Sequence, residues 1–218
     1  MLRILLTGFA PFGGDSINPT QRAVAALAGA ASPPGIALAT SVLPVTYAGA
    51  LPALRAALAT HAPDVVLGTG LAGGRAAVSV ERVAVNIDDA RLPDNDGVQR
   101  IDAPVVPGGP AAYFASVPIK AIAAAIRAAG VPAEVSQTAG TFLCNHVFYQ
   151  ACHLAATERP GLRAGFLHVP WLPEQAVEHP GEPCMALDDV LRALRAALAA
   201  VRDTTPGGDL RVAEGRVS

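Results

Sequence analysis

The sequence predicts an α/β fold in a single domain, with a sheet flanked by helices. Short apolar runs alternate with longer amphipathic segments in the order strand, helix, strand, helix, strand through residue 68, and this order is typical of such a sheet. The chain has 218 residues, of which 51% are hydrophobic, so it can bury one large core.

The first half of the chain begins with a nearly continuous apolar run, residues 2–9, as expected for a strand covered on both faces. A glycine-rich turn follows, and Pro19 in a first helical turn opens a helix over 19–27. Periodicity then predicts a strand at 36–45, a helix at 47–60 and a short buried strand at 64–68.

The second half opens with residues 78–85, which are rich in β-branched side chains and should be extended. A polar loop dense in turn formers covers 88–100. We expect helices at 118–129, 144–157 and 185–202, and strands at 133–137 and 164–169. Residues 1–203 would form the domain and 204–218 a flexible tail with little to pack against.

Composition excludes several classes of protein. The formal charge is −2, which does not favour nucleic acid or an anionic membrane surface as a partner. Three cysteines are too few for a disulfide framework and favour a reducing compartment. The N-terminal apolar run is too short for a signal peptide, and no long apolar window is present. We therefore expect a soluble, cytoplasmic protein with a small or neutral substrate.

Two segments could suggest a cofactor or a metal, and neither fits. Residues 68–73 match the dinucleotide pattern G-x-G-x-x-G, but an extended segment follows where the pyrophosphate needs a helix N-terminus. The carboxylates of 88–100 lack the spacing of a calcium loop. No CxxC pair suggests zinc. We expect neither a cofactor nor a metal.

Cys144 is the strongest candidate for a nucleophile. A loop with Gly140 and Thr141 delivers it to the start of a predicted helix, where unpaired backbone N–H groups favour an anion and should lower the thiol pKa. The alternative is that Cys144 is a small buried hydrophobic residue, as free cysteines often are.

His168 and Glu81 are candidates to assist Cys144. His168 stands at the carboxyl end of a predicted strand, where open α/β sheets bind ligands, and it could instead be a core residue. Glu81 interrupts an apolar strand and needs a buried partner. That partner could be an imidazole, as in Ser-His-Asp sites, or a cation in a salt bridge. The other histidines are weaker candidates: His61, His146, His153 and His179.

Several motifs, in one order, resemble the type I pyroglutamyl peptidases, also called pyrrolidone carboxyl peptidases. The resemblance spans residues 2 to about 202 and rests on segments 8–14 with 18–19, 72–75, 81–86, 89–95, 139–145 and 165–170. It implies an open α/β/α sandwich with a twisted mixed sheet, similar to phosphorylase and hydrolase folds. It also implies a cytoplasmic tetramer that uses no metal.

The resemblance implies a cysteine peptidase that removes N-terminal pyroglutamate from peptides through a thioester. Glu81, Cys144 and His168 would be its catalytic triad, and Arg91 would support the oxyanion. Because pyroglutamate carries no charged amine, its pocket should be largely apolar. The expected substrate-binding residues are Phe9, Phe12, Leu71, Phe142 and Leu143.

Leu71 departs from the family pattern, which often has glutamine in the motif here read Gly-Leu-Ala-Gly-Gly-Arg. A leucine makes no side-chain hydrogen bond to a lactam, so recognition could be weaker. The alternative function is therefore a non-catalytic or altered-specificity binder of peptide ends or small molecules on the same fold. A nucleoside phosphorylase-like transferase rests on fold analogy alone.

Overall fold

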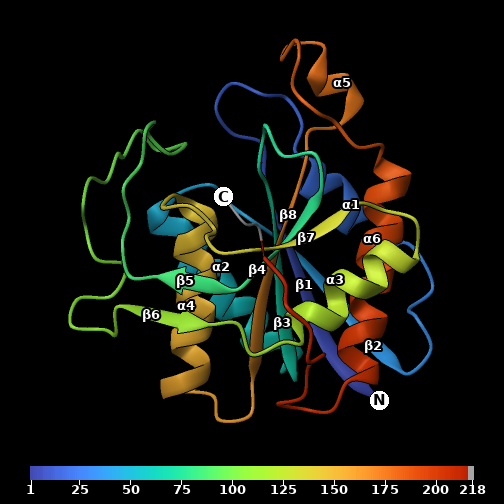
Figure 1. Ribbon diagram of the computed structural model, residues 1–218. Coiled ribbons are helices and arrows are strands. Elements are labelled where there is room, and N and C mark those ends of the chain that lie inside the picture. The colour runs from blue at the N-terminus through green and yellow to red at the C-terminus, as the bar shows by residue number, and fades with distance from the viewer. Residues whose placement is uncertain (216–218) are drawn as a thin grey trace.

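A six-stranded mixed sheet forms the centre of the protein, with strand order β2-β1-β3-β8-β4-β7 (Figure 1). The computed structural model describes residues 1–215. All neighbouring strands are parallel except β4 and β8, which are antiparallel. The strands are β1 (Leu2–Phe9), β2 (Ile36–Leu43), β3 (Val65–Leu71), β4 (Val78–Glu81), β7 (Ala133–Ser136) and β8 (Arg163–Val169).

Helices cover both faces of the sheet and complete the predicted sandwich (Figure 1). One face carries α1 (Pro19–Ala28), α3 (Ile119–Ala128) and α6 (Leu187–Asp203), and the other carries α2 (Tyr47–His61) and α4 (Leu143–Thr157). Alternation along β1 separates the two cores: Ile4 and Leu6 face the first layer, whereas Leu5 and Phe9 face the second. In residues 1–215, no helix has the length and apolarity needed to span a membrane.

Two differences from the predicted elements concern short segments. The extended run 78–85 divides between sheets: β4 belongs to the central sheet, while β5 (Val83–Val85) pairs with β6 (Ala112–Phe114) in a separate antiparallel ribbon. The sequence did not predict β6 or the short helix α5 (Pro173–Ala176). Neither segment is long enough to show a period of its own, so tertiary pairing decides both.

The C-terminal segment, expected to be a flexible tail, makes defined contacts with α3. Its described part, 204–215, lies along α3. The Asp209 carboxylate accepts hydrogen bonds from the backbone N–H groups of Lys120 (3.1 Å) and Ala121 (2.9 Å). Pro118, the N-cap of α3, supplies no side-chain acceptor, so Asp209 does so from a distant part of the chain. The Glu214 carboxylate forms an ion pair with Arg127. The rest of the predicted tail, 216–218, lies outside the described residues.

We expect Asp209→Ala to lower the free energy of unfolding by about 1 kcal/mol, because two N–H groups of α3 lose their acceptor. Urea denaturation followed by circular dichroism measures the change. Asp96→Ala is the matched control, since Asp96 is exposed and surface substitutions usually stay within about 0.5 kcal/mol. Equal stability of the two variants would contradict a capping role for Asp209.

Candidate active site

The carboxyl ends of β3 and β8 and the start of α4 bring the candidate residues into one region. In the parallel register of these two strands, Gly70 pairs with His168 and Leu71 with Val169. Ligands bind at this edge in open α/β sheets. Glu81 reaches the region from the antiparallel neighbour β4, in which Ser79 is opposite His168.

Glu81 and His168 form a buried hydrogen-bonded pair. His168 Nδ1 donates to Glu81 Oε1 over 2.7 Å, and the two residues are 3% and 0% exposed. The bond occupies Nδ1, so Nε2 is the nitrogen left for proton transfer. Of the two partners that the sequence left open for Glu81, an imidazole or a cation, the structure supplies both. Arg75 Nη1 donates to the same Oε1 at 2.7 Å.

Cys144 occupies the first turn of α4, which begins at Leu143. Phe142, the N-cap, provides no side-chain hydrogen bond to the first turn. The amide N–H groups of that turn therefore remain available to an anion. The sulfur lies against Gly70: a Cβ built there would be 2.5 Å from Cys144 Sγ and 3.0 Å from the Phe166 ring. Since Gly70 is the register partner of His168, the sulfur and the imidazole lie in the same corner of the sheet.

The prediction of a lowered thiol pKa is wrong for the free protein. Burial, followed by the negative charge of Glu81, raises the pKa of Cys144 to about 12, and the charge of Arg75 opposes this only in part. Among the hydrogen bonds of the described residues, none joins Sγ to His168. The resting thiol is therefore neutral, and its proton must leave as the sulfur attacks. The hydrogen bond from a nucleophile to its general base often forms or tightens only when substrate binds.

All five residues expected to bind substrate line one small apolar pocket with Cys144. The lining consists of Phe9, Phe12, Asn18, Val45, Leu71, Phe142, Leu143 and Cys144. Its volume is about 20 Å³, enough for about one water. A lactam ring can enter only if the walls separate. Phe12 and Phe142, whose rings are 6.1 Å apart, are both only partly buried and can move.

Arg91, the residue expected to support an oxyanion, is exposed and forms no hydrogen bond or ion pair with the described residues. The loop that carries Arg91 is nonetheless hydrogen-bonded to the loop before Cys144. Asp89 N donates to the Thr141 carbonyl (2.8 Å), and Thr141 Oγ1 donates to the Asp89 carbonyl (2.7 Å).

Two polar residues without a predicted role, Asn145 and His146, hold the start of α4. Asn145 is fully buried; its amide accepts from Val85 N and donates to the carbonyls of Val85 and Ile87, all within 3.0 Å. His146, set aside as a weaker candidate, donates from Nδ1 to the buried Asp88 at 2.9 Å. Their polarity inside an apolar helix was the available signal, because buried polar groups need partners.

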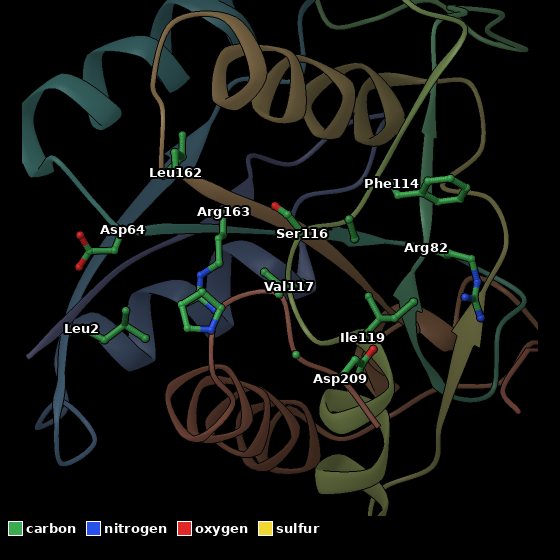
Figure 2. A pocket seen from close by; sticks show the side chains of 15 residues that line it. Leu2, Asp64, Arg82, Phe114, Ser116, Val117, Ile119, Leu162, Arg163 and Asp209 are labelled. Atoms are coloured by element: carbon green, nitrogen blue, oxygen red, sulfur yellow. The ribbon is translucent and has the colours of Figure 1, made fainter. Parts of the chain in front are cut away.

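A much larger cavity, about 620 Å³, lies elsewhere and contains none of the candidate residues. Leu2, Asp64 and Arg163 line it at the amino ends of the parallel strands, and the C-terminal segment closes one side with Asp209. Figure 2 shows Asp64 and Arg163 toward one end and Arg82 and Phe114 toward the other. Size alone therefore does not identify the active site. Within residues 1–215, no group of three or more His, Cys, Asp or Glu side chains is arranged to hold a metal.

Comparison with known proteins agrees with the resemblance seen in the motifs. A family model described as pyroglutamyl peptidase matches residues 2–204. A pyrrolidone-carboxylate peptidase of Streptomyces coelicolor is 54% identical over 99% of both chains. One from Levilactobacillus brevis is 50% identical over 92% of this chain and 97% of its own. The solved structure of pyroglutamyl peptidase I from Bacillus amyloliquefaciens superposes with a TM-score of 0.93 at 40% identity, covering 97% of this chain and 99% of that one.

We expect Gly70→Ala to destabilise the protein by about 1 to 3 kcal/mol, because the added methyl group overlaps Cys144 Sγ and the buried Phe166 ring. Urea denaturation tests this. Gly29→Ala is the matched control, since its Cβ would find no neighbour closer than 3.9 Å. If the two alanine variants were equally stable, the close approach at Gly70 would be disproved.

The raised pKa of Cys144 predicts how its alkylation depends on pH. Because the thiolate fraction grows about tenfold per pH unit below the pKa, the iodoacetamide rate at Cys144 should keep rising across the range from about pH 6 to 9.5. Mass spectrometry of the Cys144 peptide measures the rate. In the urea-unfolded protein, the same peptide should level off above about pH 8.5. A plateau below pH 8 in the folded protein would mean that the thiolate already exists.

Proposed function

The chain belongs to the pyroglutamyl peptidase family, and from this premise we propose that Glu81, Cys144 and His168 let it remove N-terminal pyroglutamate from peptides. The observation that carries the proposal is the pairing around β8. A buried carboxylate holds His168 Nδ1, and Cys144 lies against the register partner of that histidine. This arrangement provides a nucleophile, a base and an orienting acid in the order that acyl transfer requires.

In the first step, His168 Nε2 takes the proton of the Cys144 thiol while the sulfur attacks the carbonyl that joins the lactam ring to the next residue. Glu81 accepts the Nδ1 hydrogen bond throughout and stabilises the imidazolium that forms. Concerted proton transfer is needed because the free thiol is neutral at physiological pH. The product of attack is a tetrahedral intermediate with its negative charge on oxygen.

The first-turn amides of α4 are the proposed oxyanion donors, because no side chain caps them and they adjoin the attacking sulfur. One such donor is commonly worth about 3 kcal/mol in the transition state. Arg91 is a further proposed donor. It is exposed, so its side chain would have to fold over the bound substrate, and the hydrogen bonds between Asp89 and Thr141 keep its loop within the same neighbourhood.

The remaining steps return the enzyme to its starting state. The C–N bond breaks, the departing amine takes the proton from His168, and pyroglutamate stays attached to Cys144 as a thioester. His168 then accepts a proton from water as the water attacks the thioester carbonyl. The second tetrahedral intermediate collapses by breaking the C–S bond, and the sulfur recovers its proton from the imidazolium.

The pocket walls fit a small neutral ring better than a charged peptide terminus. Phe9, Phe12 and Phe142 provide apolar surfaces, and no charged side chain lines the pocket. Leu71 adds another apolar wall and is 8% exposed, so hydrogen bonds to the lactam N–H and C=O must come from backbone groups or from the Asn18 side chain, which also lines the pocket. A binder without catalysis is not favoured, since the family and its relatives at about 50% identity are named as peptidases.

Self-association and location are further parts of the proposal. Four apolar side chains on the segment between β5 and the end of β6 are 40% to 74% exposed: Leu92, Val98, Ile101 and Phe114. Exposed apolar side chains on one segment support association with another copy, in line with the tetramer implied by the family resemblance. Cys144, Cys152 and Cys184 are all free thiols, which is typical of proteins of the reducing cytoplasm.

Hydrolysis of a fluorogenic pyroglutamyl amide tests the function. We expect turnover by the wild-type protein and a loss of at least about thousandfold in Cys144→Ala, which lacks the nucleophile. Cys184→Ala is the matched control and should retain activity, because Cys184 is an exposed thiol outside the pocket. Full activity of Cys144→Ala would refute the assignment. Binding heat from a pyroglutamyl peptide without any turnover would instead indicate the binder.

A further inference from the structure

The connection between β3 and β4 carries a guanidinium that the mechanism above does not use. Arg75 is partly buried, with 26% of its side chain exposed. Its Nη1 donates to Glu81 Oε1 at 2.7 Å, and its Nη2 donates to the Thr138 carbonyl at 3.2 Å. We propose that Arg75 is a positioning residue that holds the Glu81 carboxylate toward His168 and fastens the loop leading to Cys144. This inference rests on the proposed function.

The hydrogen bonds of Glu81 show why a second donor matters. Oε1 accepts from both His168 and Arg75, whereas Oε2 is buried without a partner. Glu81 is 0% exposed, so no water shell holds the carboxylate in one orientation. Without Arg75, a single bond to the imidazole would remain, and rotation of the carboxylate would turn the ring away from the sulfur. A buried anion also needs a permanent cation while the imidazole is neutral.

The charged and titratable groups around Glu81 come from four separate elements. His168 lies on β8, Cys144 on α4 and Arg75 on the β3–β4 connection, while Glu134 on β7 accepts a hydrogen bond from Ser79 Oγ at 3.2 Å. Glu81 raises the pKa of Cys144 and Arg75 lowers it. Arg75 therefore offsets part of the repulsion between the carboxylate and the developing thiolate, in addition to orienting Glu81.

The second bond of Arg75 acts on the loop before α4. The Thr138 carbonyl also accepts from Ser136 Oγ at 3.0 Å, and Thr138 Oγ1 accepts from Gly140 N at 3.0 Å. Gly140 has φ of +76°, a conformation that favours glycine, so this turn is specified by the local sequence. Arg75 connects this turn to Glu81. One side chain therefore positions both the Glu81 carboxylate and the loop that leads to Cys144.

Three variants test the proposal, with Arg55→Gln as the matched control because Arg55 pairs with Glu158 on the surface, away from the candidate residues. We expect Arg75→Gln to lower kcat for a pyroglutamyl amide by about tenfold to hundredfold with little change in KM, as for loss of a hydrogen bond to a charged group. Arg75→Lys should recover part of this loss, because it keeps the charge but cannot make both bonds. Added guanidinium should partly restore Arg75→Ala.

The pH profile separates positioning from simple stabilisation. In Arg75→Gln, the pH dependence of kcat/KM should change along with its size, because one of the two groups that donate to Glu81 Oε1 is lost. A kcat within twofold of wild type and an unchanged profile would overturn the proposal. So would equal losses in Arg75→Gln and Arg75→Lys that track a fall in the melting temperature, since these would indicate a structural role only.

Alkylation of Cys144 by iodoacetamide keeps this inference distinct from the proposed function, because it needs no substrate. At about pH 8, Arg75→Gln should react several-fold more slowly than wild type, since Arg75 lowers the pKa of the thiol. If wild type failed to hydrolyse the amide but this difference in alkylation remained, the function would be wrong and the role of Arg75 would stand. Equal alkylation rates would overturn the role of Arg75.

Discussion

The candidate site depends on one buried carboxylate that accepts hydrogen bonds from two side chains. Glu81 has no exposed surface, and a single oxygen accepts from both the imidazole of His168 and the guanidinium of Arg75. Removing a charge from water is costly unless it is paired, so the fold must bring partners to Glu81 from β8 and from the β3–β4 connection. Once they are present, the orientation of the His168 ring is fixed through Nδ1, and Nε2 is the nitrogen left for proton transfer.

A second constraint is space at the end of β3. Gly68 and Gly70 lie within the strand. A Cβ at Gly68 would overlap the Phe166 ring, and a Cβ at Gly70 would overlap both that ring and Cys144 Sγ. The glycines therefore allow a bulky ring and a sulfur to pack directly on the sheet. Asn145 adds the complementary restraint, since it connects the start of α4 to the backbone of β5. The thiol is thus held at a helix start, where desolvation and the charge of Glu81 raise its pKa and link ionisation to proton transfer.

Much of the architecture follows from local patterns. The run of apolar residues in β1, the proline at the start of α1 and the glycine after α3 appear where periodicity and turn chemistry place them. The motif around Cys144 and the isolated Glu81 and His168 likewise stand out as polar groups in apolar surroundings. These signals are local, so they can be recognised without knowledge of the fold. The ribbon of β5 and β6 and the contacts of 204–215 could not be predicted in this way, because each depends on segments far apart in the chain.

The sequence by itself determined the fold class, the family resemblance and which residues were worth considering for chemistry. Only the tertiary structure decided their partners. It paired Glu81 with Arg75 as well as His168, left Arg91 exposed, and closed the apolar pocket to about 20 Å³. It also decided the sign of the change in the Cys144 pKa, because burial and the charge of Glu81 raise that pKa by more than the charge of Arg75 lowers it. Local propensities act over a few residues, whereas desolvation and charge pairing depend on what the whole chain packs around a group.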